Sequence, residues 1–328
     1  MKENYYIFQS GRIKRKQNTV YFENEKIKKA IPINNINAIF ALGEIDINSK
    51  LLVYLSQNNI PMHFFNHYGF YSGTYYPREY LNSGFLIVKQ VEHYLDNAKR
   101  LEIAKEIIKA SSHNILKNLL RYKSQGKDVS AIIDKIKQEQ NRIDSTQDIA
   151  ELMGLEGRIR DQYYQSLNVV LRTGFEFEKR VKRPPDNMIN CLISFGYSLI
   201  YTTVLTEIYH TQLNPTISYL HEPRERRFSL SLDLSEIFKP ILADKIIFNL
   251  INNQILKPEH FLKELNFCYL NENGKKLYLQ KYDEKLKTTI MHRKLKRKVS
   301  YRRLIRLECY KLAKHLIGAE NFEGFKTW

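Results

Sequence analysis

The spacing of apolar residues changes about a quarter of the way along this sequence of 328 residues. From Tyr5 to about Tyr76, short segments rich in β-branched and aromatic residues alternate with turn residues, which predicts an all-β module. One short helix is expected inside it, at Ser49–Gln57. Turn and polar residues interrupt the pattern at Pro77–Gly84, and apolar residues then recur about every 3.6 positions, the period of a helix. The chain is therefore expected to fold as a β-rich part followed by a helical part.

We predict an α+β, multi-domain protein. A β-sandwich-like N-terminal domain, residues 1–84, precedes a larger all-α C-terminal domain, residues 85–328, and two domains are the natural division of a chain this long. Hydrophobic residues make up 43% of the chain and charged residues 27%, which excludes a largely disordered protein. The helical period is clearest from 91 to 122. Further helices are expected at residues 129–142, 145–170, 187–210, 234–252 and 298–317.

The chain is strongly basic, with 52 Lys+Arg against 35 Asp+Glu and a formal net charge of +17. Residues 281–328 alone hold 14 basic and 5 acidic side chains. Such a charge favours polyanions, with nucleic acid ahead of anionic membrane because no apolar anchor accompanies it. A solubilising basic surface is the alternative.

Features of secretion, membrane insertion and structural zinc are not expected. The N-terminal segment lacks the apolar core of a signal peptide, and no apolar run is expected to reach the length of a membrane span. The three cysteines, Cys191, Cys268 and Cys309, have no spacing typical of a zinc site or a disulfide framework. These observations predict a cytoplasmic protein without membrane partners.

One acidic residue falls within the apolar stripe of a predicted helix. Glu156 follows Leu152 by four residues and precedes Ile159 by three, which places its carboxylate on the apolar face. A buried carboxylate normally has a cation, a metal ion or hydrogen-bond donors beside it, because it has lost its hydration. The alternative is a glutamate at the edge of the stripe that reaches solvent or pairs with Arg160.

A second cluster of residues that could bind a metal or take part in catalysis lies at 220–240. His221 is followed by Asp233 and Glu236, two acids that share one face if they begin a helix. An imidazole nitrogen and carboxylates form a hard site suited to Mn²⁺ or Mg²⁺. Each residue also has a structural interpretation, as a hydrogen-bonded core histidine, a helix N-cap and a surface acid. Three basic residues of this cluster would donate to phosphate or form a solvated loop: Arg224, Arg226 and Arg227.

The basic run near the C-terminus is typical of a surface that follows a nucleic-acid backbone. Such contacts bind phosphate without reading sequence and make affinity depend strongly on salt. A disordered tail is disfavoured, because Leu304, Leu307 and Leu312 continue a helical stripe through the run. The side chains expected to contact DNA are Arg293, Lys294, Lys296, Arg297, Lys298, Arg302 and Arg303.

Three segments carry more information than spacing alone. They are LMGLEGRIRDQYY at 152–164, RPPDNMINCLISFGYSLIY at 183–201 and LHEPRERRFSLSLDLSEIFKP at 220–240. Together they resemble the CRISPR-associated integrase and endonuclease family of spacer acquisition, in the form found with type I systems, and the similarity extends over nearly the whole chain. The resemblance implies a prokaryotic, metal-dependent DNA endonuclease or integrase with an N-terminal β domain and a helical C-terminal domain.

The resemblance also assigns the site. Glu156 matches the family's helical metal ligand, and His221 matches its histidine. Glu236 matches the last acidic ligand, where many relatives have Asp, and Asp233 matches a neighbouring acid. Glu156, His221 and Glu236 are therefore expected to bind Mn²⁺ or Mg²⁺ and to carry catalysis. Asp233 is expected to orient His221 or a metal-bound water.

Partners follow from the same resemblance. It implies a homodimer formed mainly through the N-terminal domain, and a small ferredoxin-like companion protein that joins two dimers in a heterohexamer. Double-stranded and branched DNA are the implied substrates, with a spacer 3′-hydroxyl attacking a phosphodiester of the CRISPR array. The charge alone would also explain a catalytically inert, basic DNA-binding scaffold. A general metal-dependent nuclease is a third possibility, distinguished by whether joined products form.

Overall fold

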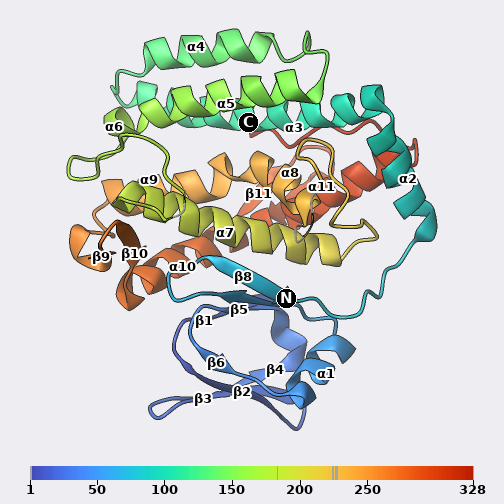
Figure 1. Cartoon of the computed structure of the whole chain (residues 1–328), viewed down its shortest axis with the longest axis vertical. Coiled ribbons are helices and arrows are strands. Elements are labelled where there is room, and N and C mark those ends of the chain that lie inside the picture. The colour runs from blue at the N-terminus through green and yellow to red at the C-terminus, as the bar shows by residue number, and fades with distance from the viewer. Residues whose placement is uncertain (1, 183, 224, 226–227, 328) are drawn as a thin grey trace.

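The computed structural model describes residues 2–182, 184–223, 225 and 228–327. A β-rich N-terminal part lies at one end of the molecule, and helices make up most of the remainder (Figure 1). The helical part begins at Gly84, directly after Ser83, whose side chain caps the first helix of this part. The expected order, a β-rich part and then a larger helical part, is confirmed.

Two four-stranded sheets form the N-terminal part. Their strands are β1 (Glu3–Ile7), β2 (Gly11–Lys16), β3 (Thr19–Glu23), β4 (Lys28–Pro32), β5 (Ile36–Ala41), β6 (Ile45–Asp46), β7 (Met62–Phe65) and β8 (Tyr71–Tyr75). The first sheet has the order β1-β5-β7-β8, and the second has the order β4-β3-β2-β6. β5 pairs in parallel with both β1 and β7. The predicted helix at Ser49–Gln57 is present as α1 and packs in the same part of the molecule.

The first sheet is buried on both faces, and its central strand β5 shows why. All six residues of β5 are buried. Ile39 and Ala41 belong to a small core shared with the second sheet and α1, while Ala38 and Phe40 point the other way into a large core formed with the helices. A strand buried on both faces reads as a nearly continuous apolar run, and β5 is apolar except for Asn37, whose side chain donates a hydrogen bond to Asn4.

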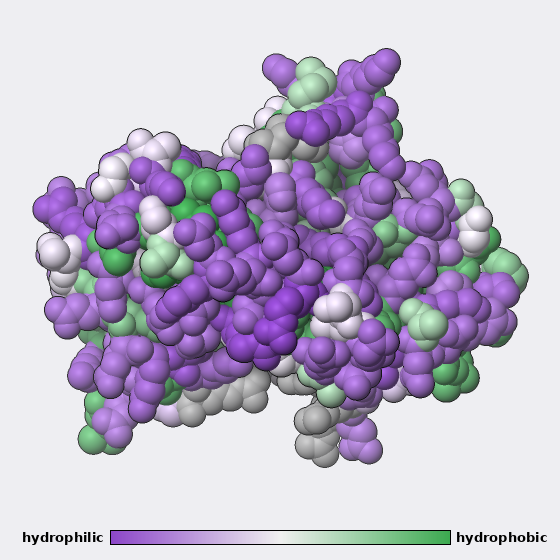
Figure 2. Space-filling view, turned by 90° about the horizontal axis from the view of Figure 1, so that it is seen from above, coloured by the Kyte–Doolittle hydropathy of each residue, from purple (hydrophilic) through white to green (hydrophobic). Residues whose placement is uncertain are grey.

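The large core belongs to the helices. They are α2 (Gly84–Leu95), α3 (Asn97–Ser124), α4 (Ser130–Asn141), α5 (Ile149–Gln165), α6 (Leu167–Val170), α7 (Met188–Tyr209), α8 (Ser229–Phe238), α9 (Lys245–Asn252), α10 (Glu272–Lys287) and α11 (Tyr301–Leu316). α7 lies between the layer of α3, α4 and α5 on one side and the N-terminal sheets on the other (Figure 1). It packs against α8 and α11. Seen from the end where α4 lies, the surface is mainly hydrophilic, with scattered hydrophobic patches (Figure 2).

α7 corrects one expectation from the sequence. Within the described residues it is the single helix whose length and composition would allow it to cross a membrane, so an apolar run of that length does exist. However, 78% of its most apolar window is buried inside the protein. A helix that is apolar all round can be buried in a large protein instead of a membrane, and packing here provides that burial.

Helix boundaries differ from the prediction where a polar residue or a proline interrupts the apolar period. Asp96 ends α2 and caps α3 by accepting hydrogen bonds from the backbone N–H groups of Ala98 and Lys99, so one expected helix is two. A π-helical turn at Pro240–Asp244 separates α8 from α9. It begins with a residue that has no N–H to donate, so the expected helix at 234–252 is interrupted.

Two hairpins and α10 have no counterpart in the prediction. β9 (Phe261–Glu264) pairs with β10 (Phe267–Leu270), and β11 (Thr289–His292) pairs with β12 (Arg297–Ser300). The basic run near the C-terminus, expected on a helix from residue 298, therefore lies partly on the β11–β12 hairpin. α11 begins only at Tyr301.

Candidate active site

Glu156 lies near the middle of α5, whose first turn is capped by the side chain of Asp148. The stripe residues Leu152 and Ile159 are buried, whereas the Glu156 side chain is 20% exposed and lies at the edge of the stripe. One turn later, Nε of Arg160 donates a hydrogen bond to Oε1 of Glu156 at 3.2 Å. The alternative in which Glu156 pairs with Arg160 is therefore what the structure shows.

His221 lies in the loop between α7 and α8, and Asp233 on α8 holds it. Oδ1 of Asp233 accepts the backbone N–H of His221 at 3.0 Å and lies 2.8 Å from its Nδ1. Oδ2 accepts the backbone N–H groups of Tyr219 and Leu220 at 2.7 and 3.0 Å. Asp233 is fully buried and both its oxygens are occupied, so it fixes the loop and the imidazole ring together.

The hydrogen bond to Asp233 selects the tautomer of His221. An acceptor beside Nδ1 keeps the proton there, so the neutral ring presents the lone pair of Nε2. In the part of the chain that the structure describes, Nε2 has no hydrogen-bond partner. Burial lowers the pKa of His221, but the hydrogen bond and charge of Asp233 outweigh burial, and the pKa of the ring is raised.

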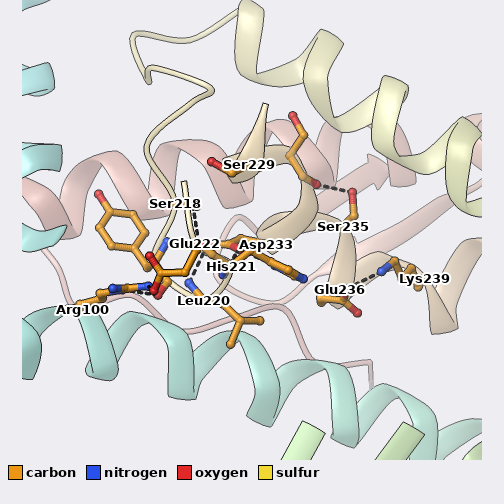
Figure 3. A network of polar contacts seen from close by, with 12 residues as sticks. Arg100, Ser218, Leu220, His221, Glu222, Ser229, Asp233, Ser235, Glu236 and Lys239 are labelled. Carbon is orange, nitrogen blue, oxygen red and sulfur yellow. Dashed lines mark hydrogen bonds and ion pairs between the residues drawn. The ribbon is translucent and has the colours of Figure 1, made fainter. Parts of the chain in front are cut away.

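Glu236 lies one turn after Asp233 on α8 and is surrounded by cations. Its side chain is only 6% exposed, and Nη2 of Arg160 donates to Oε2 at 2.5 Å. Lys239 contacts Oε1. Burial raises the pKa of Glu236, but the positive charges of Lys239 and Arg160 more than offset it, so the pKa is lowered. Figure 3 shows the contact between Glu236 and Lys239 to one side of His221 and Asp233.

The donor set fits a hard divalent cation, although Arg160 now bridges the two glutamates. Across the described ranges, no group of three or more His, Cys, Asp and Glu side chains is arranged to hold a metal ion. Nevertheless, Arg160 bonds to both Glu156 and Glu236, and the charges of Glu236 and His221 influence each other. An imidazole held at Nδ1 by a carboxylate, together with two carboxylates, matches the ligand chemistry of Mn²⁺ or Mg²⁺.

Sequence reasoning missed the residues that hold this site in place. Arg100 on α3 pairs with Glu222 at 2.6 Å and donates from Nε to the carbonyl oxygen of Tyr219 at 2.9 Å, which ties the His221 loop to α3 (Figure 3). Lys239 was detectable, because it follows Glu236 by three residues on a helix, the spacing of an ion pair. Arg100 gave no such signal, because its partners are more than a hundred residues away.

Seven of the ten residues expected to bind DNA are described by the structure, and they lie on elements other than α5 and α8. Arg224, Arg226 and Arg227 fall outside the described residues. The remaining seven lie on the β11–β12 hairpin and on α11, and most are exposed. Lys294 pairs with Glu320 at 2.9 Å. The hairpin therefore presents an exposed basic surface.

Residues 5–284 match a family model described as CRISPR associated protein Cas1. The chain belongs to this family. A curated relative, CRISPR-associated endonuclease Cas1 3 of Thermodesulfovibrio yellowstonii, is 55% identical over 326 residues and is covered, like this chain, to 99%. A solved structure of a Cas1 protein from Thermotoga maritima is 44% identical, with a TM-score of 0.90, and the match covers 99% of this chain and 100% of that one. The resemblance to this family is thereby confirmed.

Two more distant solved structures share the fold. A casposase bound to integration product is 19% identical, with a TM-score of 0.88, and the match covers 99% of this chain and 93% of that one. A Cas6-RT-Cas1–Cas2 complex is 18% identical, also with a TM-score of 0.88, and the match covers 100% of this chain and 36% of that one. At these identities the Cas1-family chain shares an architecture with both, and the likeness concerns the fold alone.

Proposed function

We propose that this Cas1-family protein is a divalent-metal-dependent DNA endonuclease and integrase that inserts short duplex spacers into a CRISPR array. The observation that carries the proposal is that Arg160 joins the carboxylates of Glu156 and Glu236, and that Glu236 lies close enough to His221 for their charges to interact. Family membership supports it, because a relative that is 55% identical over 99% of the chain is named an endonuclease. The net charge of +17 favours a polyanionic substrate.

The chemistry assigns a role to each side chain. Glu156, Glu236 and Nε2 of His221 would hold Mn²⁺ or Mg²⁺, which when bound polarises a phosphodiester and lowers the pKa of the attacking hydroxyl. Asp233 keeps the proton of His221 on Nδ1, so that Nε2 stays a ligand. Lys239, beside Glu236, is placed to donate to a phosphate oxygen. The spacer 3′-oxygen forms a new bond to phosphorus as the bond between phosphorus and the leaving strand breaks.

The assembly is part of the proposal. We expect a homodimer formed mainly through the N-terminal domain, joined by a small ferredoxin-like companion in a heterohexamer on double-stranded or branched DNA. Family membership supports this expectation, and one structural neighbour is assembled with Cas2. The exposed basic β11–β12 hairpin supports contact with the DNA backbone.

Substitutions of two residues proposed to bind the metal test the function. Glu156→Ala and His221→Ala should each reduce Mn²⁺-dependent joining of a 3′-hydroxyl duplex to supercoiled repeat DNA by ~100-fold or more, on the order of 3 kcal/mol of transition-state stabilisation. Arg158→Ala is the matched control, because Arg158 lies on the same helix but pairs with Glu139 at 3.0 Å. Melting temperature and DNA affinity are measured on the same preparations.

The outcomes separate the alternatives. Near-normal joining by a folded Glu156→Ala variant would remove that residue from the active site. A wild-type protein that binds branched DNA equally well in chelator and in Mn²⁺, and releases no product, would be an inert scaffold. Metal-dependent cleavage without any joined product would identify a general nuclease instead of an integrase.

A further inference from the structure

Arg160 carries a largely buried guanidinium that makes two ion pairs and has one nitrogen without a partner. Its side chain is 11% exposed, and it bridges Glu156 on its own helix and Glu236 on α8. Its remaining nitrogen, Nη1, is buried without a hydrogen-bond partner. Buried donors in native proteins are nearly always satisfied, and an orphan on a charged group is especially unfavourable. The orphan nitrogen therefore points to a second arrangement of this side chain.

A buried acceptor in the same region also lacks a partner. Asp244 closes the π-helical turn and is 4% exposed. Its Oδ1 accepts a hydrogen bond from the hydroxyl of Tyr197 at 3.2 Å, whereas its Oδ2 is buried without a partner. Burial raises the pKa of Asp244, and the charge of Arg160 is the strongest influence that opposes burial. The Tyr197 hydroxyl that contacts Asp244 also lies 3.5 Å from the hydroxyl of Tyr164, one turn after Arg160 on α5, so both incomplete groups belong to the same buried region.

A divalent cation bound as the proposed function requires would compete with Arg160 for the same carboxylates. Oε1 of Glu156 and Oε2 of Glu236, which Arg160 now contacts, belong to the two carboxylates that the proposed function assigns to the metal. A bound cation would also repel the guanidinium at short range. A buried guanidinium that loses its carboxylates needs another one, because an uncompensated buried charge is strongly destabilising.

We propose that Arg160 is a positioning residue whose guanidinium has two alternative sets of partners. It holds Glu156 and Glu236 together until a divalent cation binds them, and its guanidinium then turns to the unpartnered oxygen of Asp244. The inference rests on the proposed function, because it requires the two glutamates to bind the cation. Asp244 thereby contributes to metal affinity without touching the metal, as the acceptor of the group that the metal displaces.

Calorimetric titration of Mn²⁺ into the full chain tests the exchange through a double-mutant cycle. Asp244→Asn keeps an acceptor for the Tyr197 hydroxyl but offers the displaced guanidinium no charge. We expect this variant to weaken Mn²⁺ binding about tenfold, which corresponds to about 1.4 kcal/mol. In an Arg160→Gln background the same Asp244→Asn change should alter Mn²⁺ affinity less than about twofold, because no guanidinium is then displaced that needs Asp244 as a partner.

Further variants keep the test decisive. Arg158→Gln, the exposed arginine on the same helix, should leave Mn²⁺ affinity unchanged. Arg160→Lys retains a cation and should retain the effect of Asp244→Asn, which covers the case in which Arg160→Gln does not fold. Melting in chelator should be lower for Arg160→Gln than for wild type, and Mn²⁺ should raise its melting temperature by more. The reason is that Glu236 then keeps only Lys239 as a partner.

Each result supports or overturns the exchange. Equal weakening by Asp244→Asn in the wild-type and Arg160→Gln backgrounds would give Asp244 a merely structural role and overturn the inference. No weakening in either background would do the same. If wild-type protein takes up Mn²⁺ but shows no coupling, only this inference fails. If wild-type protein takes up no Mn²⁺, the proposed function fails with it.

Discussion

Asp233 illustrates how one buried carboxylate can fix a backbone segment and a side chain together. It accepts hydrogen bonds from the backbone N–H groups of Tyr219, Leu220 and His221, and it also contacts Nδ1 of the His221 ring. Three successive N–H groups directed at one anion form a concave anion-binding site of backbone atoms. The alternative that Asp233 caps its own helix is wrong, because α8 begins at Ser229 and Phe228 stands at its N-cap.

A single residue, Asp244, is expected to make stability depend on pH. Burial raises its pKa from 3.8 to about 6, against the opposing charges of Arg160 and Lys239 and the hydrogen bond from Tyr197. A pKa that is higher in the folded state means that folding binds a proton. The stabilising contribution is therefore complete below about pH 4 and is lost as pH rises through about 6, on the order of 3 kcal/mol.

Asp244→Asn should remove this dependence. In chelator, the difference in melting temperature between variant and wild type should grow in favour of the variant as pH rises from about 4 to about 6. Other titrating groups cancel in that difference. Asp161→Asn, an exposed acid on α5, serves as the control. Parallel curves for Asp244→Asn and wild type would contradict the assignment.

At the scale of helices and strands, the sequence predicts structure where the apolar period is strong. α7 was expected at 187–210 and occupies Met188–Tyr209, because nearly every turn of it supplies buried side chains. The period does not report where a helix stops. Asp96 divides α2 from α3 by capping backbone N–H groups, and the π-helical turn at Pro240–Asp244 divides α8 from α9. The short, lysine-rich β11–β12 hairpin buries too little apolar surface to produce a strand signal.

The candidate site shows the same limit. Glu156, His221 and Glu236 stand out in the sequence through local spacing and resemblance. The bridge from Arg160 to Glu236 joins residues 76 positions apart and exists only because α5 packs near α8. The place of Asp244 beside Arg160 likewise depends on the π-helical turn, which local pattern does not predict.

Close packing of α7 gives a prediction for one glycine. A Cβ at position 196 would lie 2.1 Å from Oη of Tyr278 and 3.1 Å from Cβ of Ala243. Tyr278 is fully buried, so its ring has no solvent to move into. Gly196→Ala should therefore destabilise the fold by ~1–3 kcal/mol in urea unfolding, despite the higher helix propensity of alanine.

Two variants check that the cause is overpacking. Gly157→Ala on α5, where an added Cβ meets nothing within 4 Å, should be neutral or stabilise by up to ~1 kcal/mol. Tyr278→Phe, which removes the nearest atom, should recover part of the loss when combined with Gly196→Ala. A Gly196→Ala protein as stable as wild type would show that the helices can separate at no cost.

At the scale of the whole molecule, the first N-terminal sheet joins the two parts of the chain. Ala38 and Phe40 on one face of β5 belong to the helical core, while Ile39 and Ala41 on the other face belong to the small core. The β-rich part is thus packed firmly against the helices. The boundary at residue 84 and dimer formation through the N-terminal part remain predictions.

The distribution of charge over the whole molecule leads to the last prediction. Lys296, Arg297 and Lys298 are exposed on the β11–β12 hairpin and are not among the proposed metal ligands, so they are suited to contact DNA phosphates without taking part in the reaction. Changing all three to Gln should reduce the slope of log affinity against log salt by up to ~0.9 per lost contact, because each phosphate contact releases condensed counterions. Changing three exposed lysines elsewhere, Lys123, Lys127 and Lys137, removes the same charge from the α3–α4 region and serves as the control. An equal fall in slope for both triple variants would mean that the protein responds only to total charge, and an unchanged slope for the hairpin variant would place the DNA path on another face.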